Sequence, residues 1–173
     1  LLIFFLVFLL TVFPEKFGYI ILRLNTFFDP SKGDSFQTDK ALAAIKQGGL
    51  KGQGMGEGIL KDRVPEAHTD YIISVISEEF GVIAIILILL VFLILIYSVF
   101  KKVYSENEER VKLVLVGCIS LILLQAMIHI GVNIRLFPTT GMTLPFISYG
   151  GSSIISISIL SGIILNLTKR KIH

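Results

Sequence analysis

The sequence predicts an all-α fold, a polytopic bundle of membrane helices with one large loop that contains short amphipathic helices. Hydrophobic residues make up 53% of the 173 residues and the mean hydropathy is +0.79, whereas soluble domains are about 45–50% apolar. The stretch 82–100 carries no charged residue, and about 20 apolar residues suffice for a helix to cross a bilayer. Helices are the expected form because they satisfy their backbone hydrogen bonds internally.

Four crossings are predicted, of which the first is incomplete. Residues 1–13 are apolar but too few to span the hydrocarbon core, so we expect them to be the end of a helix that begins before residue 1. Complete spans are predicted at residues 70–100, 113–134 and 147–168. With four crossings, both ends of the chain lie on the same side of the membrane.

Charge predicts how these helices are oriented. Basic residues gather in the short loop 101–112 and in the tail 169–173, namely Lys101, Lys102, Arg110, Lys112, Lys169, Arg170 and Lys171. Because short cytoplasmic loops are rich in Lys and Arg, both segments are predicted to be cytoplasmic, and the loops 14–69 and 135–146 to lie outside. The net charge of +3 is spread along the loops and provides no surface for nucleic acid.

The outer loop 14–69 is too long to be a plain connection. Its apolar residues between Phe17 and Phe28 recur every three or four positions, which is typical of a helix lying in the membrane interface. An extension of the first helix past Pro14 explains the same pattern. Residues 29–34 indicate a turn, and residues 35–47 predict a short helix that Gly48 and Gly49 end.

Residues 52–58 form a glycine-rich stretch, Gly-Gln-Gly-Met-Gly-Glu-Gly. It lacks the Gly-Lys-Ser/Thr ending of a P-loop and the spacing of a dinucleotide fingerprint. The glycines predict a tight backbone path, and binding of a phosphate by the N–H groups is a second interpretation.

Polar side chains inside the predicted spans give the strongest functional signal. They form one stripe on each of two helices: Asp70, Ser74, Ser77 and Glu78 on the first, and Gln125, His129 and Asn133 on the second. From their depths we expect Glu78 and Glu79 to face Gln125 and His129. Acidic residues within membranes are functional candidates, but hydrogen bonding between helices explains the cluster as well.

Asp70 has two interpretations. Either Thr69 or Asp70 caps the helix that follows, or Asp70 is a general base at the water-facing mouth of that helix, beneath the large loop. A further polar stretch follows the third span, where Ser148, Ser152 and Ser156 are expected to share one helical face beside Gly150 and Gly151. Close packing through small residues is the alternative for these serines.

Two ordered stretches resemble a known family. Pro65-Glu66-Ala67-His68-Thr69-Asp70 with Glu78-Glu79-Phe80-Gly81, and Leu144-Pro145-Phe146-Ile147-Ser148-Tyr149-Gly150-Gly151-Ser152-Ser153, are similar to the hallmark motifs of the SEDS proteins of shape, elongation, division and sporulation. The stretches around Asp29-Pro30 and Lys61-Asp62-Arg63 resemble the cell-division members most. The resemblance covers nearly the whole chain and implies that it corresponds to the last four of about ten transmembrane helices.

The resemblance implies a peptidoglycan glycosyltransferase that polymerises lipid II, the undecaprenyl-pyrophosphate-linked disaccharide peptide, in the bacterial plasma membrane at the division septum. It implies a class B penicillin-binding protein and other divisome proteins as partners. The family's essential outer-loop aspartate falls on Asp70, and a further acidic position falls on Asp62. In that reaction Asp70 takes the proton of the acceptor hydroxyl.

The chemistry that the resemblance implies makes several other residues candidates for binding substrate. Arg63, Lys61 and Arg23 are candidates for binding the pyrophosphate, and Glu66, His68, Ser148 and Ser152 are further candidates for binding substrate. A divalent cation, Mg²⁺ or Mn²⁺, is a candidate cofactor, but Asp62, Glu66 and Asp70 lack a recognised ligand spacing, so no metal ligand is assigned. A lipid II flippase using Glu78 and Glu79, or a non-catalytic divisome scaffold, are the alternative functions.

Overall fold

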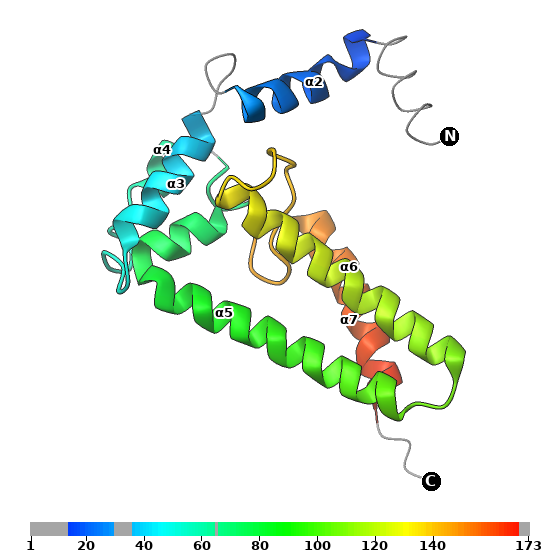
Figure 1. The fold of residues 1–173 in the computed structure, drawn as a ribbon. Helices are drawn as coiled ribbons and strands as arrows, with labels where there is room; N and C mark the ends of the chain where they lie inside the picture. The colour runs from blue at the N-terminus through cyan, green and yellow to red at the C-terminus, as the bar shows by residue number, and fades with distance from the viewer. Residues whose placement is uncertain (1–13, 30–35, 65, 170–173) are drawn as a thin grey trace.

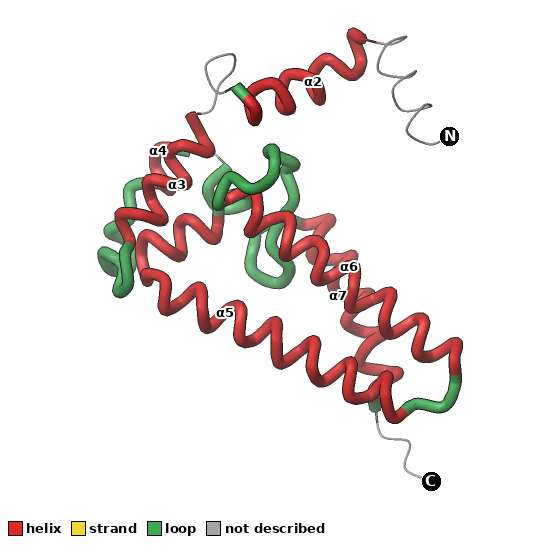
Figure 2. Tube along the Cα trace, viewed as in Figure 1, coloured by secondary structure: helices red, strands yellow, loops and turns green. Residues whose placement is uncertain are grey.

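A computed structural model describes residues 14–29, 36–64 and 66–169 of the chain (Figure 1). Over these residues the structure consists of helices and loops without strands (Figure 2), which confirms the predicted all-α class. The helices are α2 (Pro14–Phe28), α3 (Phe36–Gly48), α4 (Leu60–Arg63), α5 (Ile72–Ser105), α6 (Glu109–Asn133) and α7 (Gly151–Thr168). The predicted first crossing, residues 1–13, lies outside the described residues, and so does most of the predicted turn at 29–34.

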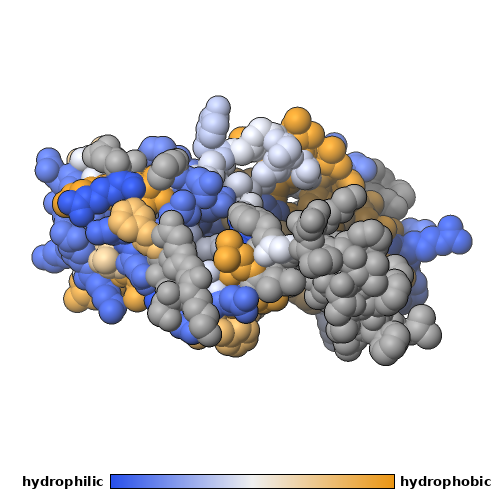
Figure 3. Space-filling view, turned by 90° about the horizontal axis from the view of Figure 1, so that it is seen from above, coloured by the Kyte–Doolittle hydropathy of each residue, from blue (hydrophilic) through white to orange (hydrophobic). Residues whose placement is uncertain are grey.

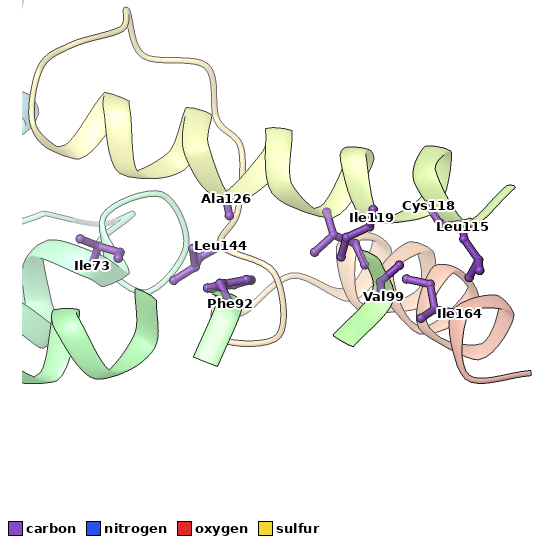
Figure 4. Close-up of a cluster of buried hydrophobic side chains, with 10 residues drawn as sticks. Ile73, Phe92, Val99, Leu115, Cys118, Ile119, Ala126, Leu144 and Ile164 are labelled. Atoms are coloured by element: carbon purple, nitrogen blue, oxygen red, sulfur yellow. The ribbon is translucent and has the colours of Figure 1, made fainter. Parts of the chain in front are cut away.

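Three of these helices, α5, α6 and α7, are long and apolar enough to cross a membrane. They pack against one another along a core that includes Phe92, Ile119 and Ile164 (Figure 4). Within the most apolar 18-residue window of α5 only 11% of the residues are buried, so most of this helix presents Leu, Ile and Val side chains outward, as a membrane helix does. The side of the membrane that each loop faces remains a prediction from the charges.

The helix ends differ from the predicted ones in ways that the backbone explains. α5 continues beyond the predicted end at Phe100 to Ser105. α7 begins at Gly151 rather than at residue 147, because Phe146 has a positive φ of 66° and the residues before Gly150 form a turn in which the Ser148 N–H donates to the Leu144 carbonyl. Ser148 therefore precedes the helix and does not share a helical face with Ser152 and Ser156.

Helix α5 is broken near its beginning. Gly81 has φ 77° and ψ −178°, a conformation that is essentially restricted to glycine. The part of α5 before the break packs against α3, while residues 82–105 form the long apolar section. The sequence predicts a continuous helix here, since a single glycine within an apolar run does not distinguish a break from a packing contact.

The outer loop has a small core of its own. Ala41 and Ala44 of α3, Leu60 of α4, and Tyr71 and Val75 at the start of α5 form one buried cluster. Viewed from above (Figure 3), hydrophilic residues gather at the end of the molecule where α3 and α4 lie in Figure 1. The loop is therefore a folded cap on the membrane helices, as its length predicted.

Candidate functional site

A cavity of about 310 Å³ lies where the outer loop meets the end of α6. Asp70 is on its wall, together with residues of α2, α3 and the loop between α6 and α7. Among the described residues, the charged ones that line it are Arg23, Glu66, Asp70 and Arg135. The cavity is thus built from segments far apart in the sequence, which explains why several of its residues do not stand out in the sequence.

Three consecutive backbone carbonyls hold the Asp70 segment in place. The His68 carbonyl accepts a hydrogen bond from the Tyr149 N–H at 3.2 Å, the Thr69 carbonyl from Ser148 Oγ at 2.8 Å, and the Asp70 carbonyl from Asn133 Nδ2 at 2.9 Å. The donors belong to the end of α6 and to the turn before α7. Hydrogen bonds from two elements therefore fix the backbone that carries Asp70, as a site with precise geometry requires.

The structure excludes the interpretation of Asp70 as a helix cap. The N-cap of α5 is Tyr71, and no side chain makes a capping hydrogen bond there. The Thr69 hydroxyl instead donates to the Glu66 carbonyl at 3.1 Å. The Asp70 carboxylate is half-buried on the cavity wall, and a Cβ built at Gly141 would lie 3.5 Å from its Oδ2.

The electrostatic environment of Asp70 is mixed. Burial raises the pKa of the Asp70 carboxyl above its ordinary value, while the nearby Arg23 charge and the neighbouring Thr69 side chain lower it. Burial, with smaller contributions from Asp70 and Glu66, raises the pKa of Tyr71 to about 12, so its phenol stays neutral at pH 7. The Asp70 carboxylate is therefore more basic than that of an exposed aspartate, which suits a general base.

The predicted pyrophosphate ligands are separated by the fold. Arg23 lines the cavity, and its Nη1 donates to the Thr139 carbonyl at 2.6 Å, which joins α2 to the loop after α6. Arg63 is exposed on α4 and is not among the cavity residues. Lys61 and Asp62 belong to the backbone of α4, but their side chains lie outside the described part of the structure.

The other predicted substrate ligands are placed differently from one another. Glu66 is exposed and lines the cavity, whereas His68 is exposed but is not among the residues that line the cavity. The Ser148 hydroxyl is buried and engaged by two backbone groups, since it also accepts from the Leu144 N–H at 2.8 Å. Ser152 is exposed in the first turn of α7. The geometry gives Ser148 a positioning role for the Asp70 segment.

The predicted intramembrane cluster engages two separate sets of partners. The Glu78 carboxylate is buried and accepts hydrogen bonds from the Ile59 and Leu60 N–H groups, at 3.1 and 3.0 Å. It thus binds the start of α4 instead of facing Gln125 and His129. The break at Gly81 and the folded loop explain the difference, because both Glu78 and Glu79 precede the break, on the section of α5 that packs under α3.

The second stripe supports the loop that borders the cavity. Gln125 Nε2 donates to the Thr143 carbonyl at 2.9 Å and to Ser153 Oγ at 3.1 Å. His129 Nδ1 lies 2.7 Å from the Met142 carbonyl.

Asn133 differs from Gln125 and His129 because it contacts α5 and the Asp70 segment rather than the loop after α6. Its Oδ1 accepts a hydrogen bond from Ser74 Oγ at 2.6 Å, while its Nδ2 donates to the Asp70 carbonyl at 2.9 Å. The two predicted stripes therefore meet at Asn133, at the cavity end of α6, rather than at the depth of Glu78 and His129.

The glycine-rich stretch is a docking segment for the broken helix. The Gln53 and Gly54 N–H groups donate to the Glu78 and Glu79 carbonyls, at 2.9 and 3.0 Å, and the Val82 N–H donates to the Gly49 carbonyl at 2.9 Å. A Cβ at Gly52 would overlap the Glu79 carbonyl. These bonds satisfy backbone groups that the break at Gly81 leaves without helical partners. The stretch is thus a tight backbone path, as predicted, and two of its N–H groups are used by α5 rather than free for a phosphate.

Several cavity residues were missed by sequence reasoning. They are Gln37 and Thr38 of α3 and Arg135, Thr139 and Gly141 of the loop after α6. None of the five was proposed as a ligand from the sequence, and Gly141 has a positive φ of 72°. Over residues 14–29, 36–64 and 66–169, no group of three His, Cys, Asp or Glu side chains is placed to hold a metal ion.

Comparisons with known proteins agree with this architecture. A family model described as "cell cycle protein", of the FtsW, RodA and SpoVE proteins, matches residues 1–173. The chain is 38% identical to a probable peptidoglycan glycosyltransferase FtsW of Caulobacter vibrioides over 155 residues, 90% of this chain and 40% of that protein. It is 40% identical to the stage V sporulation protein E of Bacillus subtilis over 157 residues, 90% of this chain and 43% of that protein.

A chain of a solved peptidoglycan synthase complex, one that coordinates polymerization and crosslinking, is similar as well. It shares 25% sequence identity with a TM-score of 0.61, over 90% of this chain and 41% of that one. The chain thus spans about two fifths of the length of the curated relatives cited above. Because the family model covers the whole chain, the chain belongs to the cell cycle protein family of FtsW, RodA and SpoVE, which is the SEDS family.

Proposed function

We propose that the protein is a peptidoglycan glycosyltransferase that polymerises lipid II at the outer face of the bacterial plasma membrane during septal wall synthesis. The observation that carries the proposal is the half-buried Asp70 carboxylate on the wall of a cavity that also contains Arg23. A base and a cation in one cavity match a reaction that removes a proton from an acceptor and releases a diphosphate. The names of the relatives support the same activity.

The proposed chemistry is a single displacement at the anomeric carbon of the donor. The acceptor hydroxyl attacks that carbon, a glycosidic C–O bond forms, and the bond from carbon to the diphosphate oxygen breaks. The lipid diphosphate leaves with the bonding electron pair, and the hydroxyl proton passes to the Asp70 carboxylate. Arg23 stabilises the negative charge that grows on the leaving group.

A metal ion receives no step in this proposal. Among the described residues, the acidic ones on the cavity wall are Asp70 and Glu66, and two carboxylates alone do not complete the oxygen ligands of Mg²⁺ or Mn²⁺. Substrate diphosphate oxygens and water would have to supply the remaining ligands. Arg23 and Arg135 already supply positive charge to the cavity.

The proposed partners follow from the same activity. A class B penicillin-binding protein would cross-link the glycan, and other divisome proteins would place the pair at the septum. Both predicted outer segments, the large loop 14–69 and the loop 135–146, contribute residues to the cavity, whereas the basic loop 101–112 joins the other ends of α5 and α6, so we place the cavity end outside and both ends of the chain in the cytoplasm.

The flippase alternative is less well supported than the enzyme. It requires Glu78 and Glu79 to line a path through the membrane, whereas the Glu78 carboxylate is buried against the start of α4. A scaffold does not require an ionisable group in a cavity.

Polymerisation by the complete protein tests the proposal. The protein would be reconstituted in liposomes with its class B penicillin-binding protein, whose cross-linking activity is blocked by penicillin, and supplied with fluorescent lipid II. We expect a ladder of glycan strands on gels. Transfer of lipid II between leaflets without any glycan would instead identify a flippase. If the protein showed neither activity, the scaffold would be the remaining interpretation.

A further inference from the structure

The side chain of Arg135 lies at the same cavity as Asp70, on a backbone position that disfavours arginine. We propose that Arg135 is a second diphosphate-binding arginine, which exchanges its ion pair with Asp39 for the diphosphate of a polyprenyl-linked saccharide. This inference rests on the proposed function and names a residue of that same site.

Helix α6 ends in a Schellman motif. The Arg135 N–H donates to the Val132 carbonyl at 3.0 Å, and the Leu136 N–H donates to the Gly131 carbonyl at 2.7 Å. Arg135 is therefore the residue after the C-cap, where the backbone is left-handed and glycine is strongly favoured. Its φ is 61°, so an arginine here carries a backbone strain that glycine would not.

The ion pair of the side chain does little to offset this strain. Arg135 Nη1 is 2.7 Å from Asp39 Oδ1, and the two side chains are 29% and 50% exposed. Exposed ion pairs contribute little to stability. A strained residue in a binding cavity points to a functional reason for its side chain.

The charges that line the cavity indicate what that reason is. Among the described lining residues, Arg23 and Arg135 are positive and Glu66 and Asp70 are negative. Without Arg135 the two carboxylates would outnumber the single Arg23, whose Nη1 already donates to the Thr139 carbonyl. An anionic substrate would then meet a net negative wall, which opposes binding.

Arginine also matches the geometry of the ligand. Its planar guanidinium donates two parallel hydrogen bonds to a phosphate, and two arginines can each take one phosphate of a diphosphate. The exchange requires little, because the Asp39 side chain is 50% exposed and gains water when Arg135 turns away. The ion pair with Asp39 thus holds Arg135 at the cavity in the absence of substrate.

The test measures binding of undecaprenyl diphosphate to the complete protein in nanodiscs of phosphatidylcholine, for the wild type and for the variants Arg135→Gly, Arg135→Lys and Asp39→Asn. We expect Arg135→Gly to weaken binding about ten-fold or more, as loss of a charge-assisted contact does, and Arg135→Lys to weaken it less. Asp39→Asn should leave binding unchanged or tighten it. Arg110→Gln, at the opposite end of α6, is the control for loss of one positive charge.

Thermal unfolding separates this role from a structural one. Arg135→Gly relieves the left-handed strain, so its melting temperature should not fall below that of the wild type, even though binding weakens. If Arg135→Gly and Asp39→Asn weakened binding equally, or if Arg135→Gly bound as the wild type does, the proposal would be overturned. It would also be overturned if nanodiscs of phosphatidylglycerol competed as well as undecaprenyl diphosphate, since Arg135 would then bind a lipid headgroup.

These outcomes do not depend on glycan synthesis. A protein that binds undecaprenyl diphosphate through Arg135 but forms no glycan would contradict the glycosyltransferase proposal alone. A protein that forms glycan while Arg135→Gly binds normally would contradict the Arg135 proposal alone.

Discussion

Replacing Asp70 with asparagine is expected to lower the rate of lipid II polymerisation by roughly 10²–10⁴-fold, the range that general base catalysis contributes. Asparagine has the shape of aspartate, but its amide cannot take the proton of the acceptor hydroxyl. The backbone of Asp70 is held by Asn133, and its neighbours by Ser148 and Tyr149, so the substitution should leave the cavity intact. Binding of lipid II should therefore stay within about two-fold of the wild type, because the arginines proposed to bind the diphosphate are unchanged.

The measurement is the initial rate of glycan formation at saturating lipid II, beside a separate binding titration. Glu109→Gln is the matched control, because Glu109 is an exposed carboxylate in the first turn of α6, at the end away from the cavity. Glycan formation by Asp70→Asn at the wild-type rate would contradict the role of Asp70. Equal loss of binding and rate would show that Asp70 contributes to substrate binding instead.

The second large effect is expected for Gly81→Ala, which should lower the free energy of unfolding by about 3 kcal/mol or more. The backbone at Gly81, with φ 77° and ψ −178°, is essentially inaccessible to alanine. The added Cβ would also overlap the Leu50 carbonyl and the Gly52 nitrogen. Either α5 straightens or the glycine-rich stretch moves away, and in both cases the hydrogen bonds of Gln53 and Gly54 to α5 are lost.

Thermal unfolding in detergent and limited proteolysis of residues 49–59 measure this effect. Gly117→Ala in α6 is the control, because no atom lies within 4 Å of the position of its Cβ and alanine favours a helix by about 1 kcal/mol over glycine. We expect early cleavage in Gly81→Ala and none in Gly117→Ala. Identical melting temperatures for the two variants would contradict the break as a structural requirement.

The sequence predicted the membrane helices well because hydropathy is a local property. The apolar run 82–100 and the charges that flank it were sufficient to locate the long part of α5, and the pattern of residues 35–47 predicted α3 to within one residue. The break at Gly81 was missed, since it arises from contact with residues 49–54, which are distant in sequence. Local patterns contain no information about such a contact.

Only part of the site was predicted, because some of its contacts also join residues that are distant in sequence. Asp70, Arg23 and Glu66 were identified and do line one cavity. Glu78 was assigned to an intramembrane cluster because helical periodicity places it on the same face as Ser74, but the folded loop offers it two backbone N–H groups at the start of α4. Arg135 was not identified as a cavity residue, and the positive φ that motivates the proposal for it is not revealed by the sequence for a residue other than glycine.

The pH dependence of polymerisation in the wild type and in Arg23→Gln tests most directly whether Asp70 is the base. A base must be ionised, so kcat/KM should fall as the pH drops through the Asp70 pKa of the free enzyme. Arg23 lowers that pKa, so removing its charge should move this acid limb to higher pH, whatever the effect on the maximal rate. An acid limb at the same pH in both proteins would contradict Asp70 as the group that titrates, and with it the proposed mechanism.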